Sequence, residues 1–139
     1  MTWVTEELWA PVTAVSAAHE GRASGLICST AVSSSLDPEH ERVVLQLRQD
    51  NLTHELALAS GAFTLHLLRH DQQELFRFLA LDTGPPYEET LARADCRIVG
   101  TLDAGDSTVI LAAVVSAERQ PGDAFTEADI VWDDALRRA

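Results

Sequence analysis

Basic residues are scarce in this sequence, which carries ten Lys and Arg against 22 Asp and Glu and has a formal net charge of −12. A protein that binds nucleic acid neutralises phosphates with clustered positive side chains. The composition therefore argues against a nucleic-acid partner, and the excess of acidic side chains mainly favours solubility.

Long hydrophobic runs are also missing. No apolar run approaches the roughly 20 residues that a membrane-spanning helix needs. Glu6 and Glu7 stand where a signal peptide would carry basic residues. We expect a cytoplasmic protein without a membrane partner.

Cysteine is rare, and the histidines lack metal-site spacing. Cys28 and Cys96 lie far apart with no CxxC pair, so we expect two buried thiols rather than a zinc site or a disulfide framework. His66 and His70 are four residues apart on a predicted strand, which at about 3.3 Å per residue separates them by roughly 13 Å. That is too far for one metal ion. We predict no metal site and expect both histidines at the surface or at an interface.

The motifs of several enzyme classes are absent as well. The sequence contains no GxGxxG, no P-loop and no nucleophile elbow. Dinucleotide-binding Rossmann folds, ATP-dependent enzymes and hydrolases with a Ser-His-Asp triad therefore have no support.

What the sequence does contain is enough apolar residues for one core. Its 139 residues are 46% hydrophobic, which predicts a single domain spanning 1–139. Alternating or continuous apolar segments predict six strands, of which the first two form a hairpin around the turn HEGRA. The predicted strands are 11–17, 24–36, 42–48, 62–68 and two that flank the turn DAGDS within 94–118.

Helices are fewer. Capping side chains at Asn51 and the glycine at Gly61 predict a helix between them. A second helix is predicted over 71–81, where Asp71 and Glu74 have the spacing of a capping box. Its predicted apolar face consists of Leu75, Phe78 and Leu79.

A third helix is predicted from Thr126 through the C-terminal segment. With six strands and two or three helices, the chain should be mainly β, as an antiparallel barrel with helices on its outside. The run from Val109 to Val115 is apolar throughout, so we expect it at the centre of the barrel or under a partner subunit.

One short segment carries an unusual concentration of hydrogen-bonding side chains. Arg48, Asn51, Thr53 and His54 all lie at the start of the first predicted helix. Unpaired N–H groups and the helix dipole favour an anion there, so the four side chains could hold a phosphate. Asn before a helix is also the commonest cap, which needs no ligand. The segment alone leaves both interpretations open.

The order of motifs around that segment resembles the flavin reductase-like, FMN-binding split-barrel family. The resemblance covers roughly residues 9–118. Family elements are a glycine before a strand reading about T-A-S, a Ser-rich continuation into a Pro turn, a strand, an N/S-x-T loop opening a helix, and SG.F before a further strand. The matching positions here are Gly25, Ile27, Cys28, Ser29, Ser33 to Ser35, Asp37, Pro38, Val43 to Leu47, Asn51 to His54, Ser60, Gly61, Phe63 and Leu68.

The resemblance implies a six-stranded antiparallel split β-barrel that binds FMN, with NAD(P)H as possible co-substrate. The strand from Ile27 through Cys28 and Ser29 to Thr30 would lie along the isoalloxazine and ribityl chain. The phosphate would be held by Asn51 and Thr53, with His54 and Arg48 as further candidates. The family also implies a homodimer with FMN near the subunit interface.

The chain departs from the family pattern in three ways. Ile27 and Cys28 replace the first two positions of the T-A-S element, and Ser107 stands where many relatives carry histidine. The connection 82–93 is shorter than usual. Two functions therefore remain open: an FMN-dependent oxidoreductase of the flavin reductase type, or a dimeric FMN-binding carrier, sensor or scaffold without efficient turnover. The catalytic residues stay unidentified.

Overall fold

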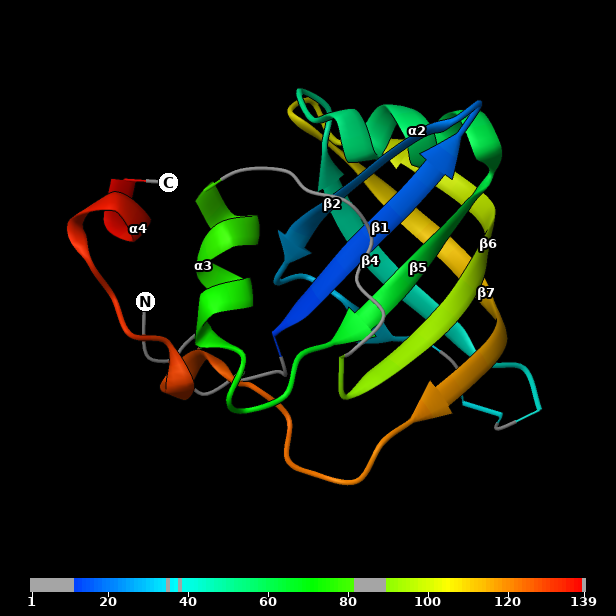
Figure 1. Ribbon diagram of the computed structural model, residues 1–139. Coiled ribbons are helices and arrows are strands. Elements are labelled where there is room, and N and C mark those ends of the chain that lie inside the picture. Colours follow the sequence, from blue (N-terminus) through cyan, green and yellow to red (C-terminus); the bar gives the residue numbers. More distant parts are fainter. Residues whose placement is uncertain (1–11, 35, 38, 82–89, 139) are drawn as a thin grey trace, which may run out of the picture.

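The seven strands in the described part of the chain form one antiparallel sheet that curls into an open barrel (Figure 1). The computed structural model describes residues 12–34, 36–37, 39–81 and 90–138. The strand order is β2-β1-β5-β6-β7-β4-β3. The strands are β1 (Thr13–His19), β2 (Arg22–Cys28), β3 (Val32–Ser33), β4 (Arg42–Arg48), β5 (Ala62–Leu67), β6 (Ala92–Asp103) and β7 (Ser107–Arg119).

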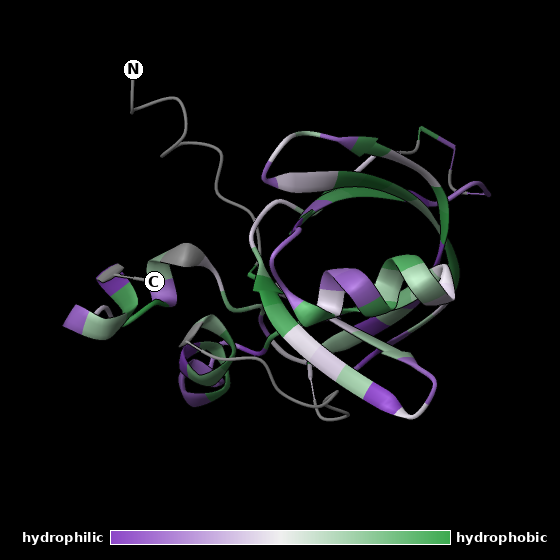
Figure 2. Cartoon of the chain, turned by 90° about the horizontal axis from the view of Figure 1, so that it is seen from above, coloured by the Kyte–Doolittle hydropathy of each residue, from purple (hydrophilic) through white to green (hydrophobic). Residues whose placement is uncertain are grey.

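Three α-helices accompany the barrel in the described part of the chain. They are α2 (Leu52–Ser60), α3 (Gln73–Leu81) and α4 (Asp134–Arg138). Viewed down the barrel, α2 lies across one end of the curled sheet (Figure 2). Helix α3 packs outside the barrel, alongside β2 (Figure 1).

The predicted hairpin is confirmed, and its turn has the expected geometry. His19 pairs with Arg22, so the loop has two residues, Glu20 and Gly21, whose φ angles are 51° and 81°. Positive φ at both loop residues matches the right-handed twist of the flanking strands. Glycine meets this requirement without steric cost.

The core has two parts, one on each face of the sheet. Inside the barrel, buried residues from β1, β2, β4, β5, β6 and β7 pack with Leu56 and Ala57 of α2. Outside it, the opposite face of β1 packs against Phe76, Leu79 and Phe125. The rings of Phe76 and Phe125 lie 5.4 Å apart, between centroids. Strand β1 is therefore covered on both faces.

The barrel is split where β2 and β4 face each other without a ladder of hydrogen bonds. Two side chains bridge them: just after β2, the Thr30 hydroxyl accepts from the backbone N–H of Gln46 at 2.9 Å and donates to its carbonyl at 3.3 Å. The Cys28 thiol donates to the same carbonyl at 3.6 Å. Both predicted buried cysteines are confirmed, since Cys28 and Cys96 are enclosed by the core.

Several predictions about elements need correction. The predicted strand 24–36 is two strands, because β2 ends at Cys28 and β3 pairs with β4 over only two residues. The sheet thus has seven strands instead of six. The predicted C-terminal helix is interrupted, with a 3₁₀ turn at Glu127–Asp129 and α4 after it.

The capping box predicted for the second helix is also wrong, and of its predicted apolar face Leu75 and Leu79 pack against the core while Phe78 does not. Helix α3 begins at Gln73, and the Asp71 carboxylate instead accepts from Arg69 Nε at 3.2 Å. Phe76 is buried with Leu79, whereas Phe78 is exposed. Phe76 packs with Leu79 and the partly buried Leu75 against the outer part of the core.

The prediction that His66 lies at the surface or at an interface is wrong, because the residue is only 2% exposed within the chain. Its Nε2 lies 2.8 Å from Ser16 Oγ, and its Nδ1 lies 3.3 Å from Thr90 Oγ1. Burial lowers the pKa of His66 to about 4, and the nearby Arg93 charge acts in the same direction. A histidine beside polar strand neighbours can be satisfied in the interior, which its position in an alternating strand did not reveal.

Candidate functional site

Two adjoining cavities open along the split of the barrel, and we call them together the β2–β4 cleft. One has a volume of about 610 Å³ and the other about 540 Å³. Both are lined by Leu26, Ile27, Ser29 and Arg48. The end of β2 and the end of β4 thus contribute to both cavities.

An apolar wall closes the larger cavity on the side of α3. The wall combines α3 with the C-terminal segment, which returns to the same face (Figure 1). Its residues are Phe76, Leu79, Ala80, Ile130, Trp132 and Leu136. A flat apolar group can therefore lie between this wall and Ile27.

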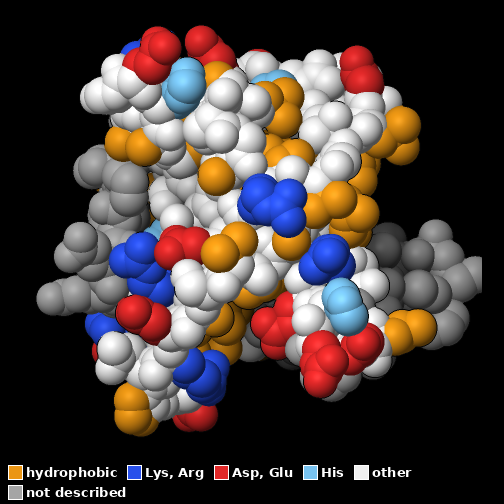
Figure 3. Space-filling view, turned by 90° about the vertical axis from the view of Figure 1, so that its right-hand side faces the viewer, with side chains coloured by type: hydrophobic (Ala, Val, Ile, Leu, Met, Phe, Trp, Pro, Cys, Tyr) orange, Lys and Arg blue, Asp and Glu red, His pale blue; other side chains and the backbone are white. Residues whose placement is uncertain are grey.

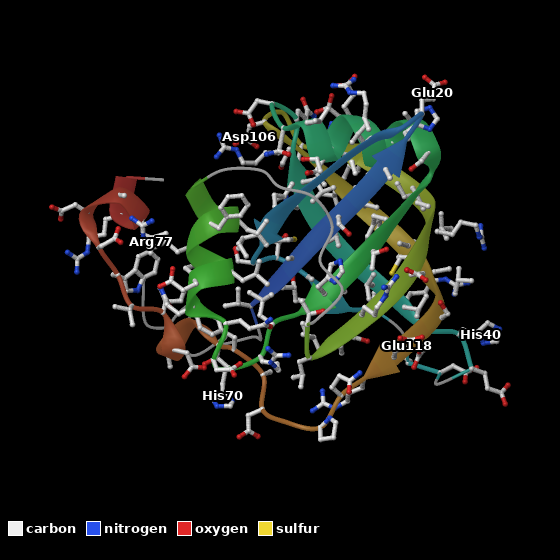
Figure 4. The ribbon with its side chains drawn as sticks, viewed as in Figure 1. Glu20, His40, His70, Arg77, Asp106 and Glu118 are labelled. Atoms are coloured by element: carbon white, nitrogen blue, oxygen red, sulfur yellow. The ribbon has the colours of Figure 1, made fainter. Side chains whose placement is uncertain are left out.

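Polar contacts hold the C-terminal segment against α3. The Gln73 side-chain amide donates to the Val131 carbonyl at 3.2 Å and accepts from its N–H at 3.1 Å. Arg77 pairs with Asp133 at 2.8 Å, and Figure 4 shows Arg77 between α3 and that segment. These contacts position the apolar wall.

The other end of the cleft is polar and lies at the start of α2. Asn51 is the N-cap, and its Oδ1 accepts from the Thr53 N–H at 2.8 Å. The guanidinium of Arg48 donates to Asp50 twice, from Nε at 3.1 Å and from Nη2 at 2.9 Å. These hydrogen bonds raise the pKa of Arg48 and lower that of Asp50.

The turn between β6 and β7 frames this polar end. The side-chain amide of Gln49 donates to Asp103 Oδ1 at 2.9 Å and to the Ser107 carbonyl at 3.0 Å. The Gln49 N–H donates to the carbonyl of Asp106, which Figure 4 shows at the same end of the barrel as α2. Asp50, Asp106 and Ser107 all line the smaller cavity.

Six of the eight residues predicted to bind cofactor line the cleft. Ile27, Ser29 and Arg48 line both cavities, Asn51 lines the larger one, and Cys28 and Thr30 line the smaller one. The predicted strand and the helix start therefore meet at one place.

Thr53 and His54 do not line either cavity. The Thr53 hydroxyl is buried and donates to Ser24 Oγ at 2.9 Å. The His54 ring points to the β6–β7 hairpin, where Nε2 lies 2.7 Å from Thr108 Oγ1. Both side chains have partners within the fold.

Reasoning from the sequence missed the apolar wall. Phe76, Ile130, Trp132 and Leu136 come from segments far from β2 in the chain. The one available signal was Trp132, a large apolar residue in the acidic stretch 131–134, which remains 51% exposed. Asp50 and Asp106 were also missed as lining residues, since single acidic residues in loops carry no motif.

The described residues include no group of three or more His, Cys, Asp or Glu side chains that could hold a metal ion. No helix within this part of the chain is long and apolar enough to cross a membrane.

Comparison with known proteins supports the resemblance drawn from the motifs. The family model described as "Flavin reductase like domain" matches residues 6–136. Over 125 residues the chain is 30% identical to the reductase component of 4-nitrophenol 4-monooxygenase/4-nitrocatechol 2-monooxygenase from Rhodococcus opacus, with 80% of this chain and 66% of the relative covered. It is 27% identical over 119 residues to a flavin reductase (NADH) from Kitasatospora aureofaciens, covering 73% and 61%.

The chain thus spans 66% of the length of the first relative and 61% of the second, less than two thirds of either. Among solved structures, the styrene monooxygenase flavin reductase from Pseudomonas putida S12 has a similar fold, with a TM-score of 0.75, 24% identity and 88% of each chain covered. At that identity the likeness concerns the fold. Because the family model covers nearly all of the sequence and the split barrel agrees with it, this chain belongs to the flavin reductase-like domain family.

Proposed function

We propose that the protein is a flavin reductase, in which NAD(P)H reduces a flavin bound in the β2–β4 cleft. The observation that carries this proposal is the division of the cleft into an apolar wall and a polar end. A flavin mononucleotide has the same division, with a flat ring at one end and a phosphate at the other. The larger cavity, of about 610 Å³, lies within the range of roughly 300–1,000 Å³ typical of small-molecule sites.

The residues present fit a flavin. The ring would lie between Ile27 and the wall that contains Phe76 and Trp132. Backbone and hydroxyl groups of Ser29 and Thr30 would line its edge and the ribityl chain. Hydride transfer is chemistry that the bound flavin supplies, while the protein binds and orients it.

Arg48 and Asn51 are the proposed phosphate contacts. Asn51 Oδ1 accepts from the Thr53 N–H, so the amide nitrogen of Asn51 is left to donate to a ligand. Arg48 can add donors from the end of β4. We propose that Thr53 and His54 act behind this layer, by fixing α2 to Ser24 and to Thr108.

NADH is the preferred candidate for the hydride donor, because the relative from Kitasatospora aureofaciens is named a flavin reductase (NADH). The Rhodococcus relative is named as the reductase component of a monooxygenase. We accordingly propose that reduced flavin leaves this protein for a separate oxygenase. FMN in place of FAD is proposed from the size of the cleft and its single polar end.

The alternative function is flavin binding without efficient turnover. The observation that favours it is Ser107, which lines the smaller cavity where many relatives carry a histidine. The short connection 82–93 also favoured it, although residues 82–89 lie outside the described residues.

One experiment separates the two functions. The purified protein is mixed with FMN without oxygen, NADH or NADPH is added, and the visible absorbance of oxidised flavin is followed. Rapid bleaching above the rate with free FMN is expected for a reductase. Bound flavin that bleaches no faster than free flavin would support the binding protein, and absence of any binding would reject both.

We further propose a homodimer with the cleft near its interface. The outer face of β6 and β7 carries exposed apolar side chains at Val99, Leu102, Leu111 and Val115, the last of them 68% exposed. Figure 3 shows hydrophobic side chains distributed over the corresponding side of the molecule, between charged ones. A second copy would remove this apolar surface from water.

A further inference from the structure

We infer that Asp50 weakens the hold of the β2–β4 cleft on a flavin phosphate and thereby sets how strongly the protein distinguishes FMN from riboflavin. This inference rests on the proposed function. Asp50 would lower the selectivity for FMN over riboflavin, because it pairs with the Arg48 guanidinium that would otherwise bind the phosphate.

Asp50 occupies the edge of the Arg48 guanidinium that a phosphate would use. Two parallel hydrogen bonds, at 3.1 and 2.9 Å, occupy the Nε–Nη2 edge of the guanidinium. That edge is one with which arginine grips a phosphate in a bidentate way. A phosphate arriving at Arg48 must displace Asp50 or use the remaining N–H groups.

The charges that line the smaller cavity also weaken the binding of a phosphate. Among its described lining residues, Arg48 is the one cation, and Asp50 and Asp106 are two carboxylates. The formal charge of this lining is therefore negative despite the arginine. A phosphate dianion gains little attraction there, while the uncharged ring and ribityl chain of a flavin lose nothing.

Both members of the pair are accessible to ligand and to mutation. The Arg48 and Asp50 side chains are 71% and 69% exposed. An exposed ion pair contributes little to stability, so its removal should leave the fold intact. Its effect on a charged ligand bound beside it persists at low salt and is screened at high salt.

The test is the substitution Asp50→Asn, with FMN and riboflavin dissociation constants measured by flavin fluorescence at low salt. FMN should bind roughly three- to tenfold more tightly than to the wild type, because one negative charge is removed and the guanidinium fork is released. Riboflavin, which has no phosphate, should bind with unchanged affinity. The gain for FMN should largely vanish near 1 M salt.

The chain provides a matched control in Asp71→Asn. Asp71 pairs with Arg69 at the same spacing of two residues, with Nε to Oδ1 at 3.2 Å, and lies outside the lining of the cleft. This variant changes the net charge equally and should leave both affinities unchanged. An equal gain for FMN in this control would show an effect of total charge and overturn the inference.

A double substitution tests whether Asp50 acts through Arg48. In an Arg48→Gln background, Asp50→Asn should give a clearly smaller gain for FMN than in the wild type. An unchanged FMN-to-riboflavin ratio in Asp50→Asn would overturn the inference while leaving the proposed function standing. If the wild type and Asp50→Asn bind neither flavin, the inference and the proposed function both fail.

Discussion

Thr53 and Ser24 are joined by a 2.9 Å hydrogen bond between their hydroxyls, and neither side chain is more than 2% exposed. The bond ties the first turn of α2 to β2 inside the barrel. A hydroxyl in such a place is satisfied without a ligand. The structure thereby gives Thr53 a clear role in positioning the helix start, whereas direct contact with a phosphate would require this bond to break.

Thr53→Val should therefore act on stability. It removes the hydroxyl with little change of shape and leaves Ser24 without its buried partner, which costs about 1–3 kcal/mol of unfolding free energy. Urea denaturation measures this loss, and Ser24→Ala in the same chain should restore part of it. A tenfold or greater loss of FMN affinity at unchanged stability would instead establish direct phosphate contact.

His66 should make the protein less stable in acid. Its pKa is about 4 in the folded protein, against 6.5 when unfolded, so the unfolded chain binds more protons between these pH values. Stability should fall as pH drops from about 6.5 to about 4, by about 3 kcal/mol at most. His66→Gln should flatten this part of the pH profile in thermal melts, while the exposed His70, changed to Gln, should not.

Arg48→Gln should affect FMN alone. Loss of the guanidinium removes a phosphate donor but no contact to the ring, so FMN should bind roughly three- to tenfold more weakly and riboflavin equally well. Fluorescence titration with both flavins measures this. A parallel loss for riboflavin would contradict the assignment of Arg48 to the phosphate end.

Trp132→Ala should weaken the binding of FMN and riboflavin alike, unlike Arg48→Gln. Its side chain lines the apolar wall and is half exposed, so its removal costs ring contacts shared by FMN and riboflavin. Both affinities should fall by a similar factor, about fivefold or more. If only FMN were affected, the orientation of the flavin in the cleft would have to be reversed.

Leu111→Asp should disrupt the proposed homodimer. A charge on the exposed apolar face of β7 would have to be buried without a partner when two copies associate. Light scattering should give a mass near 15.1 kDa for the variant and about twice that for the wild type. Phe78→Asp, on the exposed face of α3, serves as the control. A wild type that already has the mass of a single chain would reject the dimer.

Strand β4 and helix α2 could be predicted from the sequence because each is specified by residues within its own segment. Strand β4 occupies the predicted residues 42–48, and the helix between Asn51 and Gly61 has the predicted caps, with Gly61 at a φ of 73°. Alternation of polar and apolar residues and the conformational freedom of glycine suffice for both.

Long-range packing could not be predicted in the same way. Phe76 and Phe78 lie about 200° apart around the axis of α3, so only one of them can face the barrel, and packing against β1 and Phe125 selects Phe76. The His66 ring lies against Ser16 of β1 and against Thr90, which precedes β6, so its burial follows from tertiary structure. The apolar wall joins segments that no single motif connects.

The weak connection between β2 and β4 affects the thermal stability of the whole barrel. Where β2 and β4 face each other, hydrogen bonds from the Cys28 and Thr30 side chains to Gln46 stand in place of the row of backbone hydrogen bonds that joins other neighbouring strands. A ligand that contacts Ile27 of β2 and Arg48 of β4 would join the two strands and stabilise the folded barrel. Part of its binding free energy would then appear as resistance to heat, and the melting temperature would rise with ligand concentration.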